Sequence, residues 1–368
     1  MAKSLKDQAK AEAERLEKKF GSKVGATGTT KFEFGSIPTG SLALDYALGT
    51  GGWPVGHPIE VYGPRDIGKS SIVGLNAIKN AQAQGKLCGV VAIEPGWDEE
   101  WAIKNGVDPD GVIIARPDSG EQAFEILHDW ANDTIVDFML LDSIGAILKE
   151  SEISSQRKQA GEAKANVGGA SQLITWGMKG LLMPTWKNQK CVMVLNQIRD
   201  DMNGRYPGQV KTPGGRNLEH TCAVIVRLKQ QGSPIKEKFP EEEDKIIVGR
   251  ELVAIIERNK LSEGSDRRAE FTYYQMDTPT HEVGIDSGPD VARTAIRTKV
   301  VSKHGGWYHH STFPDGKLNG MNSVTDFIVE NPDCKEEIRK QVLAAMVAKE
   351  THKEFVPEEP QIEEEDPK

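Results

Sequence analysis

Residues 63–70 read Gly-Pro-Arg-Asp-Ile-Gly-Lys-Ser, which is a complete G-x-x-x-x-G-K-[ST] motif. Residues 58–62 before it, Pro-Ile-Glu-Val-Tyr, predict a short strand, and the proline-free residues 71–84 after it predict a helix. A strand, a glycine loop and a helix in this order form the context that a phosphate-binding loop requires. The motif therefore predicts an α/β fold that binds a nucleotide.

Each position of this glycine loop has a physical role toward phosphate. Gly63 and Gly68 allow close approach of the backbone, and successive N–H groups with the helix N-terminus hold phosphate oxygens. Lys69 is placed to reach the β- and γ-phosphates, and the Ser70 hydroxyl to ligate Mg²⁺. A chance glycine turn before a helix is the competing interpretation. The predicted cofactors are ATP and Mg²⁺. The predicted nucleotide contacts are Gly63, Pro64, Arg65, Asp66, Ile67, Gly68, Lys69, Ser70 and Ser71.

The composition of the 368-residue chain is that of a water-soluble protein, with 38% hydrophobic and 27% charged residues. No apolar run approaches the length of a transmembrane helix, and the charged residues 1–19 lack a secretion signal. Cys88, Cys191, Cys222 and Cys334 show no metal-like spacing and are expected to be reduced thiols. We therefore expect a cytoplasmic protein with no membrane partner.

The net charge of −9 argues at first against a nucleic-acid partner. From residue 351 onward, however, seven acids and two lysines give the chain an acidic tail with a net charge of −5. More than half of the excess negative charge therefore lies in a proline-containing segment that cannot form a core. This tail is either a solubilising end or a competitor of a polyanion for a basic groove, and its composition leaves both interpretations open.

The sequence divides into four regions. Residues 1–35 hold a helix and a glycine-rich linker, 36–268 alternate strand-like and helix-like segments, 269–350 form a smaller α/β segment, and 351–368 are the acidic tail. The strand-like runs cover residues 59–62, 88–93, 112–115, 138–141, 191–195, 223–228 and 252–257. Continuous apolar runs are typical of strands buried on both faces. They predict a doubly wound α/β core with its ligand at the carboxyl ends of the strands.

Three polar side chains follow apolar strand candidates. Asp142 is placed to hold Mg²⁺, and an acid that caps the next helix is the alternative. Glu94 is placed to orient the attacking water, and a solvated glutamate at the start of a loop is the alternative. Gln197 can donate a hydrogen bond to the γ-phosphate and report its presence to the loop that follows. Together with the glycine loop, these side chains predict an ATPase site.

The loop after Gln197 has the composition of a nucleic-acid contact. Residues 200–215 contain four glycines, two prolines, one aromatic residue and two cations, and Arg199 and Arg216 flank them. Backbone N–H groups and cations follow phosphates, while an aromatic side chain stacks with bases. A lid over the nucleotide is the alternative. Residues 150–169 are a second candidate, in which acids interrupt the cations. The predicted DNA contacts are Arg199, Arg205, Tyr206, Lys211, Thr212, Gly214, Gly215, Arg216, Arg157, Lys158 and Lys164.

Several short motifs occur in a fixed order along the chain. Residues 36–45 and 51–56 precede the glycine loop, Pro-Asp-Ser-Gly-Glu-Gln-Ala occupies residues 117–123, and Asn-Gln-Ile-Arg occupies residues 196–199. In order and spacing these motifs resemble the bacterial RecA-type recombinase family, phage versions included. The resemblance implies a RecA-like P-loop ATPase core with an N-terminal helical arm and a small C-terminal α/β domain.

The resemblance implies roles for the residues at the strand ends. Glu94 is similar to the family's catalytic glutamate, which activates water, and Asp142 is similar to its Walker B aspartate. Gln197 resembles the γ-phosphate sensor that couples ATP to DNA binding. Asp98 and Trp101 fall where the family has an acid and a tyrosine that contact adenine.

The resemblance also implies contacts between subunits. Arg258 and Lys260 resemble two cations that reach across a filament interface to the neighbour's ATP, with an arginine here in place of one lysine. The N-terminal helix resembles the arm that packs on the next subunit, and residues 269–350 resemble the domain that gathers duplex DNA. The predicted catalytic residues are Lys69, Glu94, Gln197, Arg258 and Lys260.

Four departures from the family pattern stand out. Pro-Gly-Trp occupies residues 95–97, where the family has His-Ala-Leu, and the segment between Asp142 and Gln197 is longer than expected. Two acids at residues 200–201 stand near a position where a basic residue is expected, and His220 falls near an interface aromatic. The first two departures favour a phage origin over a host origin.

These observations predict a DNA-dependent ATPase that forms ATP-dependent helical filaments on single-stranded DNA and catalyses homologous pairing and strand exchange in recombination and repair. The expected partners are single-stranded and double-stranded DNA and further copies of the chain. A hexameric helicase with the same core is one alternative. A single-stranded-DNA-binding mediator that has lost turnover is another, motivated by Pro95 and Gly96.

Overall fold

The computed structural model describes residues 4–21, 26–28, 34–94, 96–132, 135–151, 153, 169–200, 210–239, 241, 243–262 and 267–350. The chain divides into two units, Met1–Gly35 and Ser36–Lys368. The first unit contains the helix α1 (Leu5–Phe20), which begins where the Ser4 hydroxyl accepts a hydrogen bond from the backbone N–H of Asp7 at 3.2 Å. The predicted N-terminal helix is therefore confirmed.

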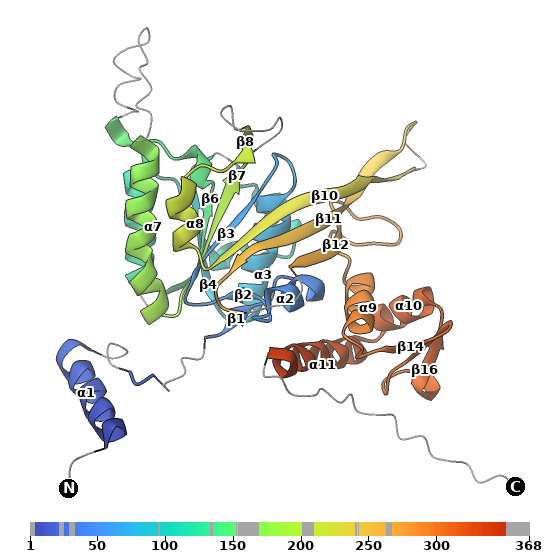
Figure 1. Cartoon of the computed structure of the whole chain (residues 1–368). Helices are drawn as coiled ribbons and strands as arrows, with labels where there is room; N and C mark the ends of the chain where they lie inside the picture. Colours follow the sequence, from blue (N-terminus) through green and yellow to red (C-terminus); the bar gives the residue numbers. More distant parts are fainter. Residues whose placement is uncertain are drawn as a thin grey trace, which may run out of the picture. The chain divides into compact units, whose positions relative to one another are not determined.

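A sheet of nine strands, counted over the described residues, forms the centre of the second unit (Figure 1). Its order is β13-β12-β11-β10-β3-β7-β6-β4-β5. The strands are β3 (Pro58–Gly63), β4 (Leu87–Ala92), β5 (Val112–Ala115), β6 (Val136–Asp142), β7 (Cys191–Gln197), β10 (Val224–Glu237), β11 (Ile246–Asn259), β12 (Arg268–Tyr274) and β13 (Gly284–Ile285). In this order, adjacent strands pair antiparallel from β13 as far as β10. From β10 through β3, β7, β6 and β4 to β5, adjacent strands pair in parallel. Each apolar run predicted as a strand is confirmed.

Both faces of the sheet are buried, which explains the continuous apolar runs. Along β6, for example, Leu140 belongs to one core cluster, whereas its neighbour Met139 belongs to the other. The first cluster includes side chains of α2 (Leu42–Leu48) and α3 (Leu75–Ala83). The second includes α5 (Gly120–Asn132), α7 (Gly169–Lys187) and α8 (Gly215–Thr221), of which α7 and α8 are seen on one side of the sheet in Figure 1.

The predicted end of the core at residue 268 is wrong. β12 pairs with β11 from Arg268 to Tyr274, and β13 pairs with β12, so the central sheet continues to Ile285. In β12 the side chains of Ala269, Phe271 and Tyr273 are buried in the first core cluster. The strand was missed because polar residues alternate with these apolar ones, as expected near the edge of a sheet rather than in its centre.

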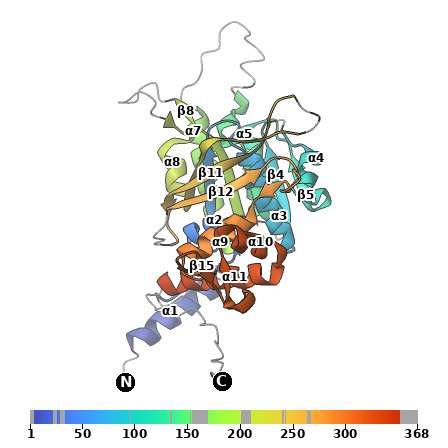
Figure 2. The ribbon, with the colours of Figure 1, turned by 90° about the vertical axis from the view of Figure 1, so that its right-hand side faces the viewer.

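The C-terminal segment has a core of its own, which includes Val291, Phe313 and Ile338. Its elements are α9 (Ser287–Arg297), β14 (Ser302–His304), β15 (Trp307–His309), β16 (Lys317–Asn319), α10 (Met321–Glu330) and α11 (Pro332–Glu350). In Figure 2 these helices gather beside α2. Polar contacts fix this position, since the buried Asp290 carboxylate accepts a 2.9 Å hydrogen bond from the Ser41 hydroxyl at the start of α2.

Shorter elements connect the main ones. They are β1 (Ser36–Ile37), β2 (Trp53–Pro54), η1 (Lys69–Gly74), α4 (Glu99–Lys104), η2 (Pro109–Gly111), η3 (Ile144–Ala146), β8 (Arg199–Asp200), β9 (Val210–Lys211) and η4 (Pro314–Gly316). The four cysteines are buried free thiols, as predicted. Within the described residues, none of the helices combines the length and the apolar character needed to cross a membrane.

Candidate active site

The glycine loop joins the end of β3 to a helix that starts in an unexpected conformation. The helix predicted over residues 71–84 is present, but its first part, η1, is a π-helix that begins at Lys69, and regular α-helix starts only at Leu75. Gly68 has φ 86°, and a Cβ atom there would lie 2.3 Å from Cδ1 of Ile72. This position therefore requires glycine both for its backbone angle and for its close packing.

Lys69 is folded back over the loop. Its ammonium group donates hydrogen bonds to the carbonyl oxygens of Gly63 at 3.2 Å and Pro64 at 2.7 Å. Burial lowers the pKa of Lys69, while the nearby carboxylates of Asp142 and Glu94 raise it. A largely buried cation at the centre of a glycine loop is suited to a phosphate, whose oxygens would replace these carbonyl partners.

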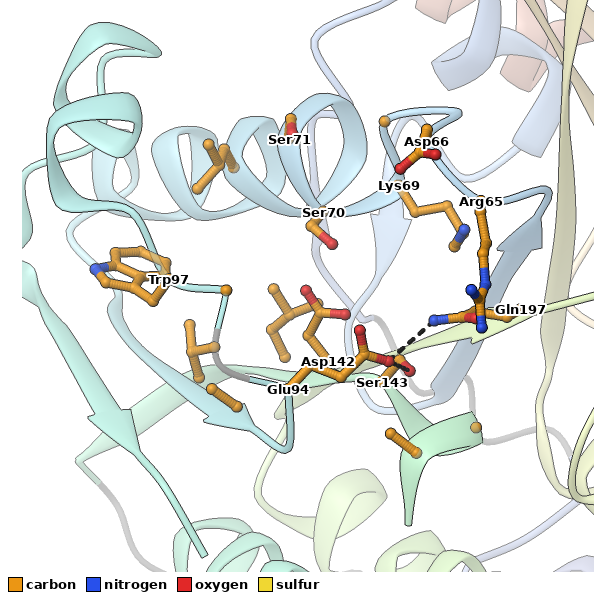
Figure 3. Close-up of a pocket in the computed structure, with 18 of the residues that line it drawn as sticks. Arg65, Asp66, Lys69, Ser70, Ser71, Glu94, Trp97, Asp142, Ser143 and Gln197 are labelled. Carbon is orange, nitrogen blue, oxygen red and sulfur yellow. Dashed lines mark hydrogen bonds between the residues drawn. The ribbon is translucent and has the colours of Figure 1, made fainter.

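A cavity of about 660 Å³ opens beside the loop, where the parallel strands β3, β7, β6 and β4 end (Figure 3). Its polar side is formed by the side chains that the sequence predicted to act together: Lys69, Ser70, Glu94, Asp142 and Gln197. Arg65, Asp66, Gly68 and Ser71, which the sequence predicted as nucleotide contacts, also line the cavity. Gly63, Pro64 and Ile67, predicted as contacts too, do not line it, and the side chain of Ile67 is buried in the core.

Glu94 is held by two hydrogen bonds that end on the same oxygen. Nε2 of Gln197 and the hydroxyl of Ser143 each donate to Oε1 of Glu94 at 2.9 Å, and both bonds are drawn in Figure 3. Among the described residues, none is seen to donate a hydrogen bond to Oε2 of Glu94, and the residue is exposed. The role of Ser143 was not predicted, although its position directly after Asp142 was the available signal.

Asp142 and Ser70 are the candidate ligands of the metal ion. Burial raises the pKa of Asp142, whereas the nearby Ser70 hydroxyl lowers it. No group of three or more His, Cys, Asp or Glu side chains in the described part of the chain forms a metal cage. One carboxylate and one hydroxyl fit Mg²⁺, which proteins commonly bind through few side chains together with phosphate oxygens.

The other end of the cavity is apolar. Leu75, Val90, Ala92, Leu140, Trp97 and Trp101 line it. Asp98, predicted to contact adenine, also lines the cavity and begins α4, where its Oδ1 accepts a hydrogen bond from the backbone N–H of Trp101 at 3.0 Å. Trp97 belongs to a departure from the family pattern, and no nucleotide contact was predicted for it. The structure places its half-buried indole on the cavity wall, at the end away from Lys69 (Figure 3).

Arg258 and Lys260, also predicted to be catalytic, do not line this cavity. Instead Arg258 donates a hydrogen bond to the backbone oxygen of Glu219 at 2.9 Å, and Lys260 donates one to that of His220 at 2.6 Å. Both acceptors lie in the last turn of α8, where cations are favoured by the free carbonyl groups of a helix. The two cations therefore stand apart from the nucleotide cavity of their own chain.

The 200–215 loop begins and ends in a short antiparallel ladder. In this ladder Arg199 pairs with Lys211, and Arg199 also donates a hydrogen bond to the Gly145 oxygen at 2.9 Å beside the cavity. The chain then turns through Gly214 and Gly215, whose φ angles are 91° and 60°, into α8. Thr212 and the exposed Arg216 flank this turn. The other predicted DNA contacts lie outside the described residues: Arg205, Tyr206, Arg157, Lys158 and Lys164.

The fold and the cavity define a P-loop nucleotide-binding protein, with its ligand site where parallel strands end. The family model described as the RecA N-terminal domain matches residues 7–273. Proteins named Protein RecA match as well. The one from Rhodopirellula baltica is 32% identical over 340 residues, covering 91% of this chain and 84% of its own. The Thermus aquaticus protein is 32% identical over 318 residues, covering 85% and 86%. The chain therefore belongs to the RecA family.

Proposed function

We propose that this protein is a DNA-dependent ATPase that assembles on single-stranded DNA as a filament and exchanges strands with homologous duplex DNA. The observation that carries the proposal is the contact between Glu94 and Gln197. It joins the acid suited to activate water to Gln197, shortly before the glycine-rich 200–215 loop, which Arg199 and Arg216 flank. Gln197 would thus sense a nucleotide in the cavity at the start of the loop that is suited to bind DNA.

The proposed reaction uses Glu94 as the general base. Its two hydrogen bonds fix Oε1, which leaves Oε2 to accept a proton from a water molecule that attacks the γ-phosphorus. As the water oxygen bonds to that phosphorus, the bond to the β,γ-bridging oxygen would break and ADP would leave with this oxygen. Lys69 would stabilise the negative charge that develops on the transferred phosphoryl group. Mg²⁺, held by Ser70 and Asp142, would supply charge neutralisation for the β- and γ-phosphates. These roles require no residue beyond those that line the cavity.

The proposed assembly gives Arg258 and Lys260 their role. Because they lie outside the cavity of their own chain, they are available to reach the nucleotide of a neighbouring subunit. ATP between two subunits would then stabilise the filament, and hydrolysis would weaken it. Backbone and cationic contacts from the 200–215 loop would hold DNA without reading its bases, so that base pairing selects the homologous strand.

Electron microscopy with a non-hydrolysable ATP analogue, combined with a strand-exchange assay, tests this proposal. We expect helical filaments that form on single-stranded DNA only when the nucleotide is present, together with exchange products from homologous duplex DNA. Closed six-membered rings without filaments would favour a helicase. Filaments that support no strand exchange and no hydrolysis would favour a mediator that has lost turnover.

A further inference from the structure

We propose that Glu60 and Asn196 are positioning residues that connect the phosphate-sensing Gln197 to the end of the 200–215 loop. The inference rests on the function proposed above and adds to it a buried route between the nucleotide and the DNA-binding segment. Glu60 lies on β3 and Asn196 on the neighbouring β7, where the two strands pair in parallel. Neither residue touches the nucleotide cavity.

The Asn196 amide uses both of its donors and its acceptor oxygen. Its Nδ2 donates to Oε1 of Glu60 at 2.8 Å and to the backbone oxygen of Pro213 at 2.9 Å. Its Oδ1 accepts a hydrogen bond from the backbone N–H of Gln197 at 2.9 Å. Because the donors meet two oxygens and the acceptor meets an N–H, only one orientation of the amide satisfies the set. The Asn196 side chain thus connects β3, the backbone of Gln197 and the end of the 200–215 loop.

Burial of Glu60 and Asn196 costs desolvation free energy, so a buried polar pair at these positions requires an explanation. Glu60 is 1% exposed and Asn196 is fully buried. Burial raises the pKa of Glu60 to about 7, the hydrogen bond from Asn196 opposes that shift, and the negative charges of Glu219 and Glu257 add to it. Two apolar residues at these positions would avoid the desolvation of a carboxyl group and an amide.

Among the described residues, no cation is found among the groups that shift the pKa of Glu60. Glu219 approaches from α8 and Glu257 from β11, and Cys222 and Tyr62 interact with it electrostatically. The Asn196 amide is its hydrogen-bond donor among the described side chains. The carboxyl group therefore serves to orient that amide rather than to complete an ion pair.

The packing next to Asn196 links the same parts. A Cβ atom at Gly145 would lie 3.3 Å from Oδ1 of Asn196 and 3.3 Å from Cγ of Pro213, so both residues lie against this glycine. The oxygen of Gly145 accepts the hydrogen bond from Arg199. A shift of Gln197 toward a phosphate would pull on Asn196 through the backbone. The shift would then reach Pro213, directly before the glycine turn into α8.

The test measures the dissociation constant for single-stranded DNA without and with a non-hydrolysable ATP analogue. The first constant divided by the second gives the ratio by which the analogue raises the affinity. Asn196→Asp keeps the acceptor for Gln197 but loses both donated hydrogen bonds, so we expect this ratio to fall at least tenfold. Glu60→Gln keeps an acceptor oxygen for Asn196, so we expect a ratio within twofold of the wild type. Asn188→Asp is the matched control, because Asn188 donates a 2.8 Å hydrogen bond to the Ala131 oxygen far from this pair.

The double substitution Glu60→Gln with Asn196→Asp separates positioning from stability. The amide at position 60 then donates to position 196, which restores the buried hydrogen bond in the reverse direction, while the Pro213 oxygen still lacks its donor. We expect a melting temperature above that of Asn196→Asp alone, and a ratio that stays at least tenfold below the wild type. Recovery of the ratio together with the melting temperature would overturn the inference, because stability alone would then explain the effect.

A replacement variant and the response of the wild type complete the test. If Asn196→Asp does not fold, Gly145→Ala replaces it, since its new methyl group presses on Asn196 and Pro213, and we expect a lower ratio there too. A wild-type protein whose DNA affinity does not respond to the analogue would contradict the proposed function itself. A wild type that responds, with Asn196→Asp and Gly145→Ala variants that respond equally, would contradict only the role of Glu60 and Asn196.

Discussion

Nε2 of Gln197 donates a 2.9 Å hydrogen bond to Oε1 of Glu94, although Gln197 ends β7 and Glu94 follows β4, and these strands are not neighbours in the sheet. β6 lies between β7 and β4, and Ser143 at its end donates to the same oxygen. If the Gln197 amide turned to a γ-phosphate, Glu94 would lose one of its two donors. The state of the nucleotide would then change both the hydrogen bonding of Glu94, the general base, and the start of the 200–215 loop.

Lys69→Ala should abolish nucleotide-dependent activity. Lys69 is the largely buried cation of the glycine loop, and loss of one preorganised electrostatic group costs about 10²–10³-fold in rate. Steady-state ATP hydrolysis and nucleotide-dependent filament formation measure this loss. Lys79→Ala, at an exposed position of α3, is the matched control and should behave like the wild type. Full strand exchange by Lys69→Ala would show that the loop is not the working site.

Glu94→Gln should slow hydrolysis while leaving ATP-dependent filaments intact. A glutamine cannot accept the proton of water, and loss of a general base costs about 10²–10⁴-fold. Its amide oxygen can still accept the hydrogen bonds from Gln197 and Ser143 that Oε1 of Glu94 accepts now. Single-turnover hydrolysis and electron microscopy on the same samples separate the two effects. Disappearance of the filaments would mean that Glu94 is structural.

Trp97→Leu should weaken nucleotide binding with little change in the turnover rate at saturation. The indole lines the apolar end of the cavity, away from the groups assigned to the chemistry. Loss of an aromatic wall is worth about 0.5–1.5 kcal/mol, or roughly threefold to tenfold in the dissociation constant. Energy transfer from tryptophan to a fluorescent ATP analogue reports binding. Trp176→Leu, at a residue 56% exposed on α7, serves as the control, and equal losses in both variants would contradict a local role.

The stability of the protein should depend on the ionisation of Glu60. Burial raises the pKa of Glu60 from its usual 4.5 to about 7. Between these two values the folded state holds a proton that the unfolded state has released, so the free energy of unfolding falls as the pH rises. One proton corresponds to a slope of about 1.4 kcal/mol per pH unit at most.

Urea unfolding at pH 5, 6, 7 and 8 measures this dependence in the wild type and in Glu60→Gln. The substitution should make the decline between pH 5 and pH 7 shallower, because the amide does not titrate. Identical slopes in the two proteins would show that Glu60 does not hold a proton in the folded state over this range.

The strands of the core were predictable because burial on both faces leaves a continuous apolar run, as in residues 191–195 of β7. Strand ends that meet at one edge then bring Glu94, Asp142 and Gln197 together without further information. β12 was missed because it lies near the antiparallel edge, where polar and apolar residues alternate. Local pattern is therefore a good guide to the centre of this sheet and a poor guide to its edge.

Contacts between segments distant in the sequence were not predictable. The amide of Asn196 was noted as a strand end, but its partner Glu60 lies 136 residues away and is reached only through the pairing of β3 with β7. The same holds for Lys260, whose acceptor is the His220 oxygen. Only the folded arrangement of strands and helix termini shows these contacts, because no short motif encodes them.

The most direct test of the account is the steady-state rate of ATP hydrolysis by the full-length wild-type protein, with and without single-stranded DNA. A cavity that joins Glu94 to the origin of the 200–215 loop predicts a rate that rises at least tenfold when the DNA is added, and no such rise in Lys69→Ala. Hydrolysis at the same rate with and without DNA, or no hydrolysis in either condition, would contradict it.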